Sequence, residues 1–464
     1  MNYQPPTSAF DEAFADDGRV RPVYAELIGA LSRMDLALLA EAVAGEAAER
    51  GVCFVHDGVP ETFTLDPVPR LLDVEEWSPL EHGLAQRVRA LDRFVADVYA
   101  DQEIVAAGVV PGRALESCDH FEPRLVGLPP APVRIAVAGL DVVRGGHGRF
   151  GVLEDNVRTP SGMAYALAAR ECLDAHVPSW LADGRRPLDN AIDLLGQALR
   201  EAAPDGVTDS TIVMLSDGPE NSAWYEHQRL AGLLEIPIVS LGDLSVRGGR
   251  LEARAGRARV RVDVLYRRTD EDRLTNEAGG LTDIGAKLWE PMENGKLTCV
   301  NAFGTGVADD KLVHAYVEDM VRFYLGEEPL LPSVTTYDPD VTDQRDVVLD
   351  RIDELVIKPR TGHGGHGVVV APHAHEDDVR EVAAAVHADP GSFIAQETVM
   401  ISTHPTVIGD HLEPRHVDLR PFVFLAGDEP SVVAGGLTRV ALDPGALVVN
   451  SSQRGGGKDT WVMA

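Results

Sequence analysis

The clearest candidates for chemistry are polar side chains at alternate positions of one short segment. Glu154, Asn156 and Arg158 are spaced two residues apart, so on a strand they lie on one face. Asp141 precedes them by the length of a hairpin and joins that face if the register preserves parity. Carboxylate and amide oxygens are ligands that Mg²⁺ takes beside nucleotide phosphates, and Arg158 would stand where negative charge develops. The alternative is a solvated acidic hairpin.

A glycine-rich turn follows an apolar strand at residues 356–370, VIKPRTGHGGHGVVV. Glycine lets backbone N–H groups approach a phosphate closely, and Lys358 adds a cation beside them. The segment matches neither a Walker loop nor a Rossmann fingerprint, and a plain hairpin turn is the alternative. The loop NAFGTGVADDK ends in Lys311, which either reaches a phosphate or is a surface lysine after a helix cap. The glycines of the first turn are Gly362, Gly364, Gly365 and Gly367.

Further basic groups recur near the C-terminal end. RHVDLR places Asp418 and Arg420 on one strand face, and GGLTRV places Arg439 on another strand. The last glycine loop, NSSQRGGGKDTW, carries Asn450 and Lys458. Basic groups that cluster by motif in an acidic protein favour an anionic substrate.

The elements that must position these residues change along the chain. Residues 22–105 are predicted to be mainly helical, and Val133 opens a pair of strands joined by a glycine turn. Residues 211–345 alternate short apolar runs with helical stretches, which is typical of an α/β domain with a parallel sheet. The remainder is predicted to be rich in strands, with one helix near EDDVREVAAAVHA.

Composition excludes several classes of function. The 464 residues are 44% hydrophobic and can bury a large core, and the net charge of −32 disfavours nucleic-acid binding. Four cysteines without C-x-x-C spacing indicate reduced thiols rather than disulfides or zinc. An acidic N-terminus and the lack of a long apolar run predict a cytoplasmic protein without membrane contact.

Together the motifs resemble the ATP-grasp superfamily, with one difference in order. In that superfamily the D…E-x-N hairpin usually closes the chain, whereas here LEDNVRTPSG precedes the lysine and glycine turn. This inversion resembles the circularly permuted (type 2) ATP-grasp family related to the synthetase domain of glutathionylspermidine synthetase. Other matching motifs are NAFGTGVADDKLVHAYVEDM, VIKPRTGHGGHG, IAQETVMISTHPT, RHVDLRPFV and GGLTRVAL.

The resemblance implies an α/β fold, a circularly permuted ATP-grasp with a Rossmann-like pre-ATP-grasp domain and a helical N-terminal region. Four regions are expected. They are a helix-rich N-terminal region (1–130), the metal-binding hairpin segment (131–175), the Rossmann-like domain (176–345) and the nucleotide-binding lobes (346–464).

The resemblance also implies roles for individual residues, with ATP and two Mg²⁺ ions as cofactors. The expected magnesium ligands are Asp141, Glu154 and Asn156. The expected nucleotide-binding residues are Lys311, Lys358, the lid glycines Gly362, Gly364, Gly365 and Gly367, the hinge pair Gln396 and Glu397, and Asn450. The groups expected to contact the transferred phosphate or acyl phosphate are Arg158, Arg420 and Arg439.

These roles imply a carboxylate–amine ligase that joins a small carboxylate and an amine, such as an amino acid or peptide, through an acyl phosphate. A phosphotransferase is one alternative, in which an acceptor simply takes the γ-phosphate. The other is a nucleotide-gated component of a complex with an alpha-E or transglutaminase-like partner, because relatives are commonly encoded beside such proteins.

Overall fold

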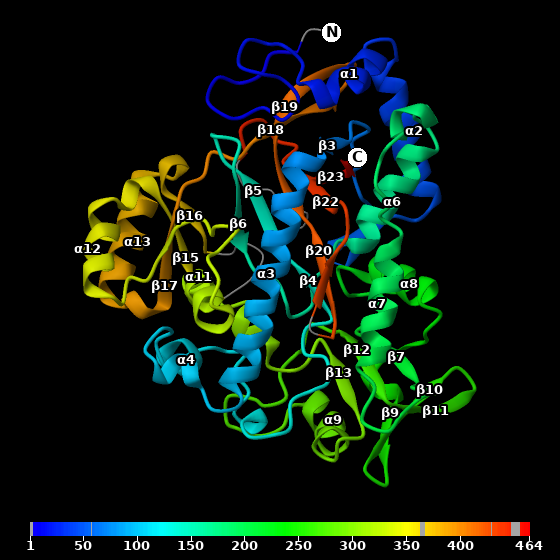
Figure 1. Ribbon diagram of the computed structural model, residues 1–464, viewed down its shortest axis with the longest axis vertical. Helices are drawn as coiled ribbons and strands as arrows, with labels where there is room; N and C mark the ends of the chain where they lie inside the picture. Colours follow the sequence, from blue (N-terminus) through cyan, green and yellow to red (C-terminus); the bar gives the residue numbers. More distant parts are fainter. Residues whose placement is uncertain (1–2, 57, 362–366, 428, 447–454) are drawn as a thin grey trace.

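A large sheet, drawn from three distant parts of the chain, is the frame of the molecule (Figure 1), and its strands are antiparallel except that β3 pairs in parallel with β23. The computed structural model describes residues 3–56, 58–361, 367–427, 429–446 and 455–464. Within these residues the strand order is β3-β23-β22-β19-β5-β6, and β18 pairs with β19. The strands are β3 (Arg70–Leu72), β5 (Asp141–Arg144), β6 (Phe150–Glu154), β18 (Thr403–Ile408), β19 (His411–Arg420), β22 (Leu437–Val440) and β23 (Gly456–Val462).

The strand expected from Val133 is divided into β4 (Val137–Gly139) and β5, because the chain passes there from a second sheet into the large sheet. β4 pairs with β20 (Phe422–Ala426) in the second sheet, which also contains β21 (Glu429–Val432). β5 instead pairs with β19. On the partner strands, Pro421 separates β19 from β20, and proline has no N–H to continue a ladder.

A parallel sheet lies within residues 211–345, where the alternation of apolar runs and helical stretches predicted one. Its order within the described residues is β13-β12-β7-β8, and each neighbouring pair is parallel. The strands are β7 (Ile212–Ser216), β8 (Ile238–Val239), β12 (Val264–Arg268) and β13 (Thr298–Val300), with helices α7 (Asn190–Glu201), α8 (Trp224–Leu233) and α9 (Asp283–Glu293). A further antiparallel sheet, β11-β10-β9, extends this domain with β9 (Leu244–Arg247), β10 (Arg250–Ala255) and β11 (Ala258–Val262).

A small antiparallel sheet forms the lobe at the left of Figure 1. Its strands are β14 (Thr336–Tyr337), β15 (Leu355–Pro359), β16 (Val369–Val370) and β17 (Phe393–Glu397), and its helices are α12 (Thr342–Asp350) and α13 (Glu376–Ala388). Leu355, Ile357 and Ala395 are buried on one face, in a core shared with Val382 and Val386 of α13. The opposite face of this small sheet is therefore the one whose side chains can contribute to the candidate active site.

The N-terminal region is helix-rich but not wholly helical. Its first part forms two helices, α1 (Ala25–Leu31) and α2 (Leu36–Glu49), and Asp35 caps α2 by accepting from Leu38 N–H at 3.1 Å. Short strands β1 (Cys53–His56) and β2 (Val59–Thr62) form a hairpin. β3 pairs with β23 and so joins the large sheet.

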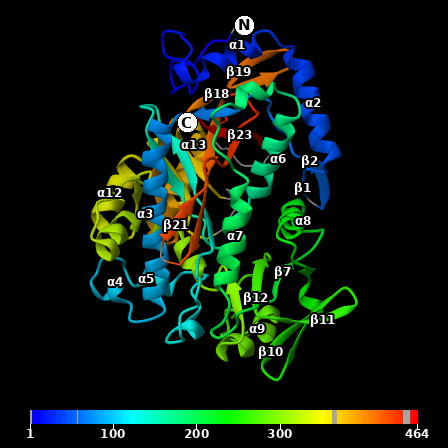
Figure 2. The same cartoon turned by 45° about the vertical axis from the view of Figure 1, so that its right-hand side comes forward.

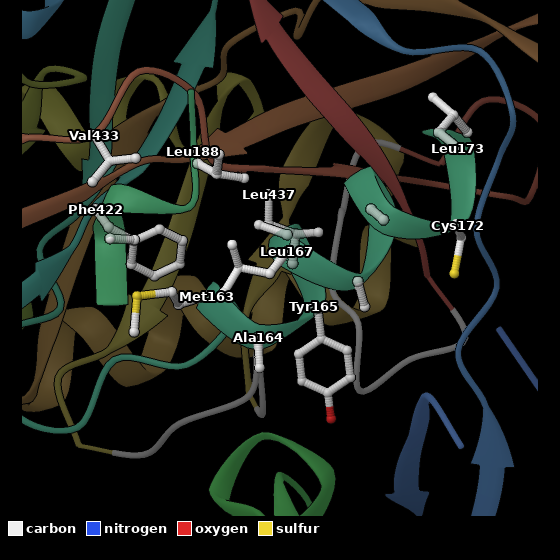
Figure 3. Packing of buried hydrophobic residues seen from close by; sticks show 14 of the residues in the cluster. Met163, Ala164, Tyr165, Leu167, Cys172, Leu173, Leu188, Phe422, Val433 and Leu437 are labelled. Carbon is white, nitrogen blue, oxygen red and sulfur yellow. The ribbon is translucent and has the colours of Figure 1, made fainter. Parts of the chain in front are cut away.

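Two helix layers bury the sheets. The long helix α3 (Val74–Val98) packs on one side, where Leu84 and Phe94 share a core with Leu419 and Val423. On the other side α6 (Met163–Asp174) places Met163 and Leu167 beside Phe422, Val433 and Leu437 (Figure 3). The shorter helices are α4 (Glu103–Ala106), α5 (Arg113–Glu116), α10 (Lys311–His314) and α11 (Val317–Met320). None of the described helices combines the length and apolar character needed to cross a bilayer.

Candidate active site

Two lysines and a glutamate from three separate elements meet in one pocket. Lys358 lies on β15, Lys311 begins α10, and Glu154 ends β6. Lys358 Nζ is 3.5 Å from Glu154 Oε1. The residues that line the pocket are Leu153, Glu154, Asp155, Asp309, Lys311, His314, Lys358, Ile394 and Gln396.

Strand parity explains why Lys358 points into this pocket. Its neighbours Leu355 and Ile357 belong to the core of the small lobe, so Lys358 takes the opposite face of β15. The register pairs Lys358 with Ile394, and Gln396 follows two residues later on the same face. All three side chains line the pocket.

Two lysines and three carboxylates line the pocket, and one of the carboxylates, Asp155, is paired with Arg87, which is not among the lining residues. Burial lowers the pKa of Lys311, and the like charge of Lys358 lowers it further, against the opposing effect of Glu154. Lys358 is 6% exposed. Two ammonium groups held close together in a partly dry pocket are stabilised by a bound anion, and a phosphate chain fits this requirement.

Gln396 and Glu397, the hinge pair predicted from the sequence, point to opposite faces of β17. Gln396 faces the pocket, and its amide donates to Leu153 O at 3.3 Å and to Thr336 Oγ1 at 3.0 Å. Glu397 takes the other face, where it accepts from Arg351 at 2.8 and 3.0 Å and from Tyr337 Oη at 2.6 Å. The hydrogen bonds from Arg351 hold the pKa of Glu397 below its usual range.

A second cluster of charges lies on one face of the large sheet. Arg420 Nη2 is 2.6 Å from Asp141 Oδ1, and Arg439 Nη2 is 2.8 Å from Asp141 Oδ2. Asp418, directly opposite Arg439 in the register, also pairs with it. Burial alone would raise the pKa of Asp141, but Arg420 and Arg439 outweigh it and hold that pKa below the ordinary value. We call Asp141, Asp418, Arg420 and Arg439 the arginine clamp.

The predicted magnesium ligands therefore have different surroundings. Asp141 is held by the clamp, whereas the Glu154 side chain is 41% exposed and has Lys358 beside it. Asn156 has a buried amide nitrogen without a hydrogen-bond partner. The described residues contain no group of three or more His, Cys, Asp or Glu side chains arranged to hold a metal. One carboxylate with phosphate oxygens is a donor set that Mg²⁺ commonly accepts, so Glu154 fits an ion carried in by a nucleotide.

Arg158 lies apart from the arginine clamp. The prediction that Asn156 and Arg158 continue a strand is wrong, because β6 ends at Glu154. Arg158 instead donates to Asp272 at 2.8 Å, and its Nε lies 3.6 Å from Asp309 Oδ2. Since Asp309 lines the pocket, Arg158 borders the pocket from behind this carboxylate.

Sequence reasoning missed two acidic residues of the pocket. Asp155 accepts from Arg87 at 2.6 and 2.7 Å and contacts His314 Nδ1 at 2.7 Å. Asp309 accepts from Val157 N–H at 2.6 Å, and burial raises its pKa to about 7 despite Arg158. Asp309 lies within the NAFGTGVADDK motif, two residues before Lys311, and this position was the available signal.

The remaining expected residues fall outside this description or elsewhere in the fold. Gly362, Gly364, Gly365 and Asn450 lie outside the described residues. Gly367 is described, and its φ of 73° is one that glycine adopts without strain. Lys458 does not join the basic cluster. It is fully buried on the face of β23 opposite to Arg439 and pairs with Asp66.

The pocket with Lys311 and Lys358 is thus lined by residues of the small antiparallel lobe and of the large sheet. The chain belongs to the circularly permuted ATP-grasp type 2 family, whose model matches residues 69–441. An uncharacterised protein of Mycobacterium leprae (strain TN) is 42% identical over 464 residues, covering 98% of this chain and 82% of that protein.

Two further similarities extend this result. A Frankia casuarinae protein provisionally named glutamate–cysteine ligase 2-2 is 42% identical over 469 residues, covering 99% of this chain but 54% of that protein. The solved apo structure of a glutathione synthetase-like effector from Globodera pallida superposes with a TM-score of 0.60 at 13% identity. The match covers 93% of this chain and 98% of the effector. The expected fold class is thus confirmed.

Proposed function

We propose that this protein is an ATP- and Mg²⁺-dependent carboxylate–amine ligase that works through an acyl phosphate. The observation that carries the proposal is the meeting of Lys311, Lys358 and Glu154 in one pocket. Family membership and the name of the Frankia relative support ligase chemistry. Because this chain covers only 54% of that relative, the substrates in the relative's name are part of the proposal for this chain.

In this proposal the pocket holds the nucleotide phosphates. Lys311 and Lys358 neutralise them, and Gln396 faces the nucleotide from the small lobe. Glu154 and Asn156 would hold Mg²⁺, which would neutralise phosphate oxygens and polarise the phosphorus. Asp141 becomes a third ligand only if it exchanges one of its arginine partners for the ion.

The chemical steps need little covalent help from the protein. A substrate carboxylate oxygen attacks the γ-phosphorus and ADP leaves. The amine then attacks the acyl carbon and inorganic phosphate leaves. Arg420 and Arg439, aligned by Asp141, stabilise the transferred phosphate. Asp309 is placed at the pocket to accept the proton that the amine loses, and catalysis is mainly positioning.

The test is ADP release with ATP and Mg²⁺ across pooled amino acids and short peptides, beginning with glutamate and cysteine. Hydroxylamine is included to trap an acyl phosphate, and folded Glu154→Gln is the control. We expect substrate-dependent ADP, a hydroxamate and loss of both in the variant. Phosphorylated product without hydroxamate would favour the phosphotransferase. ATP binding without stimulated ADP release would favour the nucleotide-gated partner protein.

A further inference from the structure

A basic surface on a strongly acidic protein is not used by the proposed reaction. The sheet β11-β10-β9 projects from the parallel sheet at the lower right of Figure 1, and its β10–β11 end stands clear of the rest in Figure 2. Residues 243–263 carry six arginines and three carboxylates, whereas the rest of the chain has 36 basic and 71 acidic residues. The sign of the charge is thus reversed locally.

Strand parity places most of these arginines on one face. Leu251, Ala253 and Val262 are buried in the core of the α/β domain, so the alternate residues of the same strands point outward. The register puts Arg254 opposite Arg259, and it also pairs residues 247 with 250 and 252 with 261. We call the outward set of arginines the arginine face, which consists of Arg247, Arg250, Arg254, Arg259 and Arg261.

The exposed arginines Arg254 and Arg259 are not explained by the needs of folding, whereas Arg261 pairs at 2.7 Å with the buried carboxylate of Asp263. Arg254 opposes Arg259 across two strands, and like charges in directly opposite positions destabilise a sheet. The side chains of Arg254 and Arg259 are 68% and 49% exposed, and their carboxylate contacts are at 2.8 Å to Asp243 and 3.5 Å to Glu252. Single exposed pairs of this kind contribute little to stability and are readily exchanged.

We propose that the arginine face docks an acidic segment, rich in Asp and Glu, of a partner protein. Guanidinium groups bind carboxylates through two parallel hydrogen bonds, which lysine cannot do. A strand-sheet surface holds five such groups at fixed spacings. An acidic segment that lies across the sheet replaces the weak contacts to Asp243 and Glu252 with bidentate ones.

Two other polyanionic partners fit the surface less well. The arginine face carries no aromatic side chain on which a nucleic-acid base could stack. A long phosphate backbone would also extend from it over a surface with an excess of acidic residues. A second copy of the chain carries the same net charge of −32, and two such molecules repel each other.

The experiment measures fluorescence anisotropy of a labelled ten-residue glutamate peptide with the full chain. It is done in about 0.1 M salt, where the screening length is about 10 Å, so the local surface dominates over the net charge. The test variant is Arg254→Glu with Arg259→Glu. The control is Arg322→Glu with Arg380→Glu, which makes the same charge change at side chains 46% and 75% exposed elsewhere. Circular dichroism and thermal melting verify the fold of both.

We expect saturable binding of the glutamate peptide that weakens at least about tenfold in the test variant and is unchanged in the control variant. Arg254→Gln with Arg259→Gln should give an intermediate loss. Absence of binding, or equal loss in both charge-reversal variants, would overturn the proposal. Tighter binding of a ten-nucleotide single-stranded DNA would do so too, as would self-association of the chain that the test variant abolishes.

Discussion

The arginine clamp and the pocket of Lys311 and Lys358 each bring two cations together, but the two sites differ in how closely carboxylates pair with those cations. In the clamp, Asp141 and Asp418 neutralise two arginines, and Asp141 contacts both at 2.6 and 2.8 Å. In the pocket, Lys358 Nζ is 3.5 Å from Glu154 Oε1, and Lys311 donates to Arg360 O at 3.4 Å. The clamp is therefore complete without a ligand, whereas the pocket gains stability when an anion enters. We therefore expect that loss of a clamp carboxylate lowers the stability of the fold, and that loss of a pocket lysine lowers activity more than stability.

The largest expected effect breaks the pocket without breaking the fold. Lys358→Met should lower kcat/KM for ATP by about 10³-fold or more, because a positive charge that attracts the phosphates is lost. Its thermal stability should stay the same or rise, since a poorly paired buried ammonium is removed. Kinetics of ADP release and a thermal melt measure the two quantities. The matched control is Lys287→Met, which removes an ammonium that donates to Leu244 O outside the pocket. Equal activity of the two variants would contradict the assignment of Lys358 to phosphate binding.

The next effect breaks the clamp. Asp141→Asn removes a carboxylate from the buried Arg439 and the partly buried Arg420, and breaking a buried pair costs about 3–5 kcal/mol of unfolding free energy. Urea unfolding measures this change. Asp174→Asn removes one carboxylate from a more exposed pair with Arg185 and should cost less than about 1 kcal/mol. If both variants lose similar stability, the clamp is not the structural cluster described above.

The third effect is a pH dependence of stability that comes from Asp309 of the pocket and not from the clamp. Burial raises the pKa of Asp309 to about 7 from 3.8, so the folded chain keeps a proton that the unfolded chain has released. The stability that this proton contributes is present below pH 4 and is lost as the pH rises through 7. Asp309→Asn should therefore be more stable than the natural chain by roughly 1–4 kcal/mol above pH 7.

Below pH 4 the two proteins should differ little in unfolding free energy, and urea unfolding at several pH values tests this. Ligase activity should rise with pH through about 7 in the natural chain, and this rise should disappear in Asp309→Asn. An unchanged pH profile of activity in the variant would exclude Asp309 as the proton acceptor.

The smallest expected effect sharpens the boundary of the pocket. Gln396 lines the pocket, while Glu397 is turned away toward Arg351 and Tyr337. Gln396→Ala should raise KM for ATP about tenfold, and Glu397→Gln about threefold or less, because a lost neutral hydrogen bond is worth about 1 kcal/mol. Steady-state kinetics distinguish them. The reverse order would place the nucleotide on the other face of β17.

Much of the fold and part of the candidate site follow from local patterns. The α/β rhythm of residues 211–345 predicted the parallel sheet, and the helix near EDDVREVAAAVHA is α13. Two-residue spacing correctly placed Asp418 and Arg420 on one face. The passage between two sheets at Pro421 and the end of β6 at Glu154 were not foreseen, because they depend on how two sheets meet rather than on the pattern of either strand.

The amino-acid sequence by itself determined the permuted order of the motifs and the face of each strand on which a side chain lies. Only the tertiary structure decided which charges neutralise one another. Asp141 meets Arg420 and Arg439 across separations of 279 and 298 residues, and Lys458 finds Asp66 across 392. Alternation along a strand is a local property of the backbone, whereas burial and ion pairing require the partner segment to be in place.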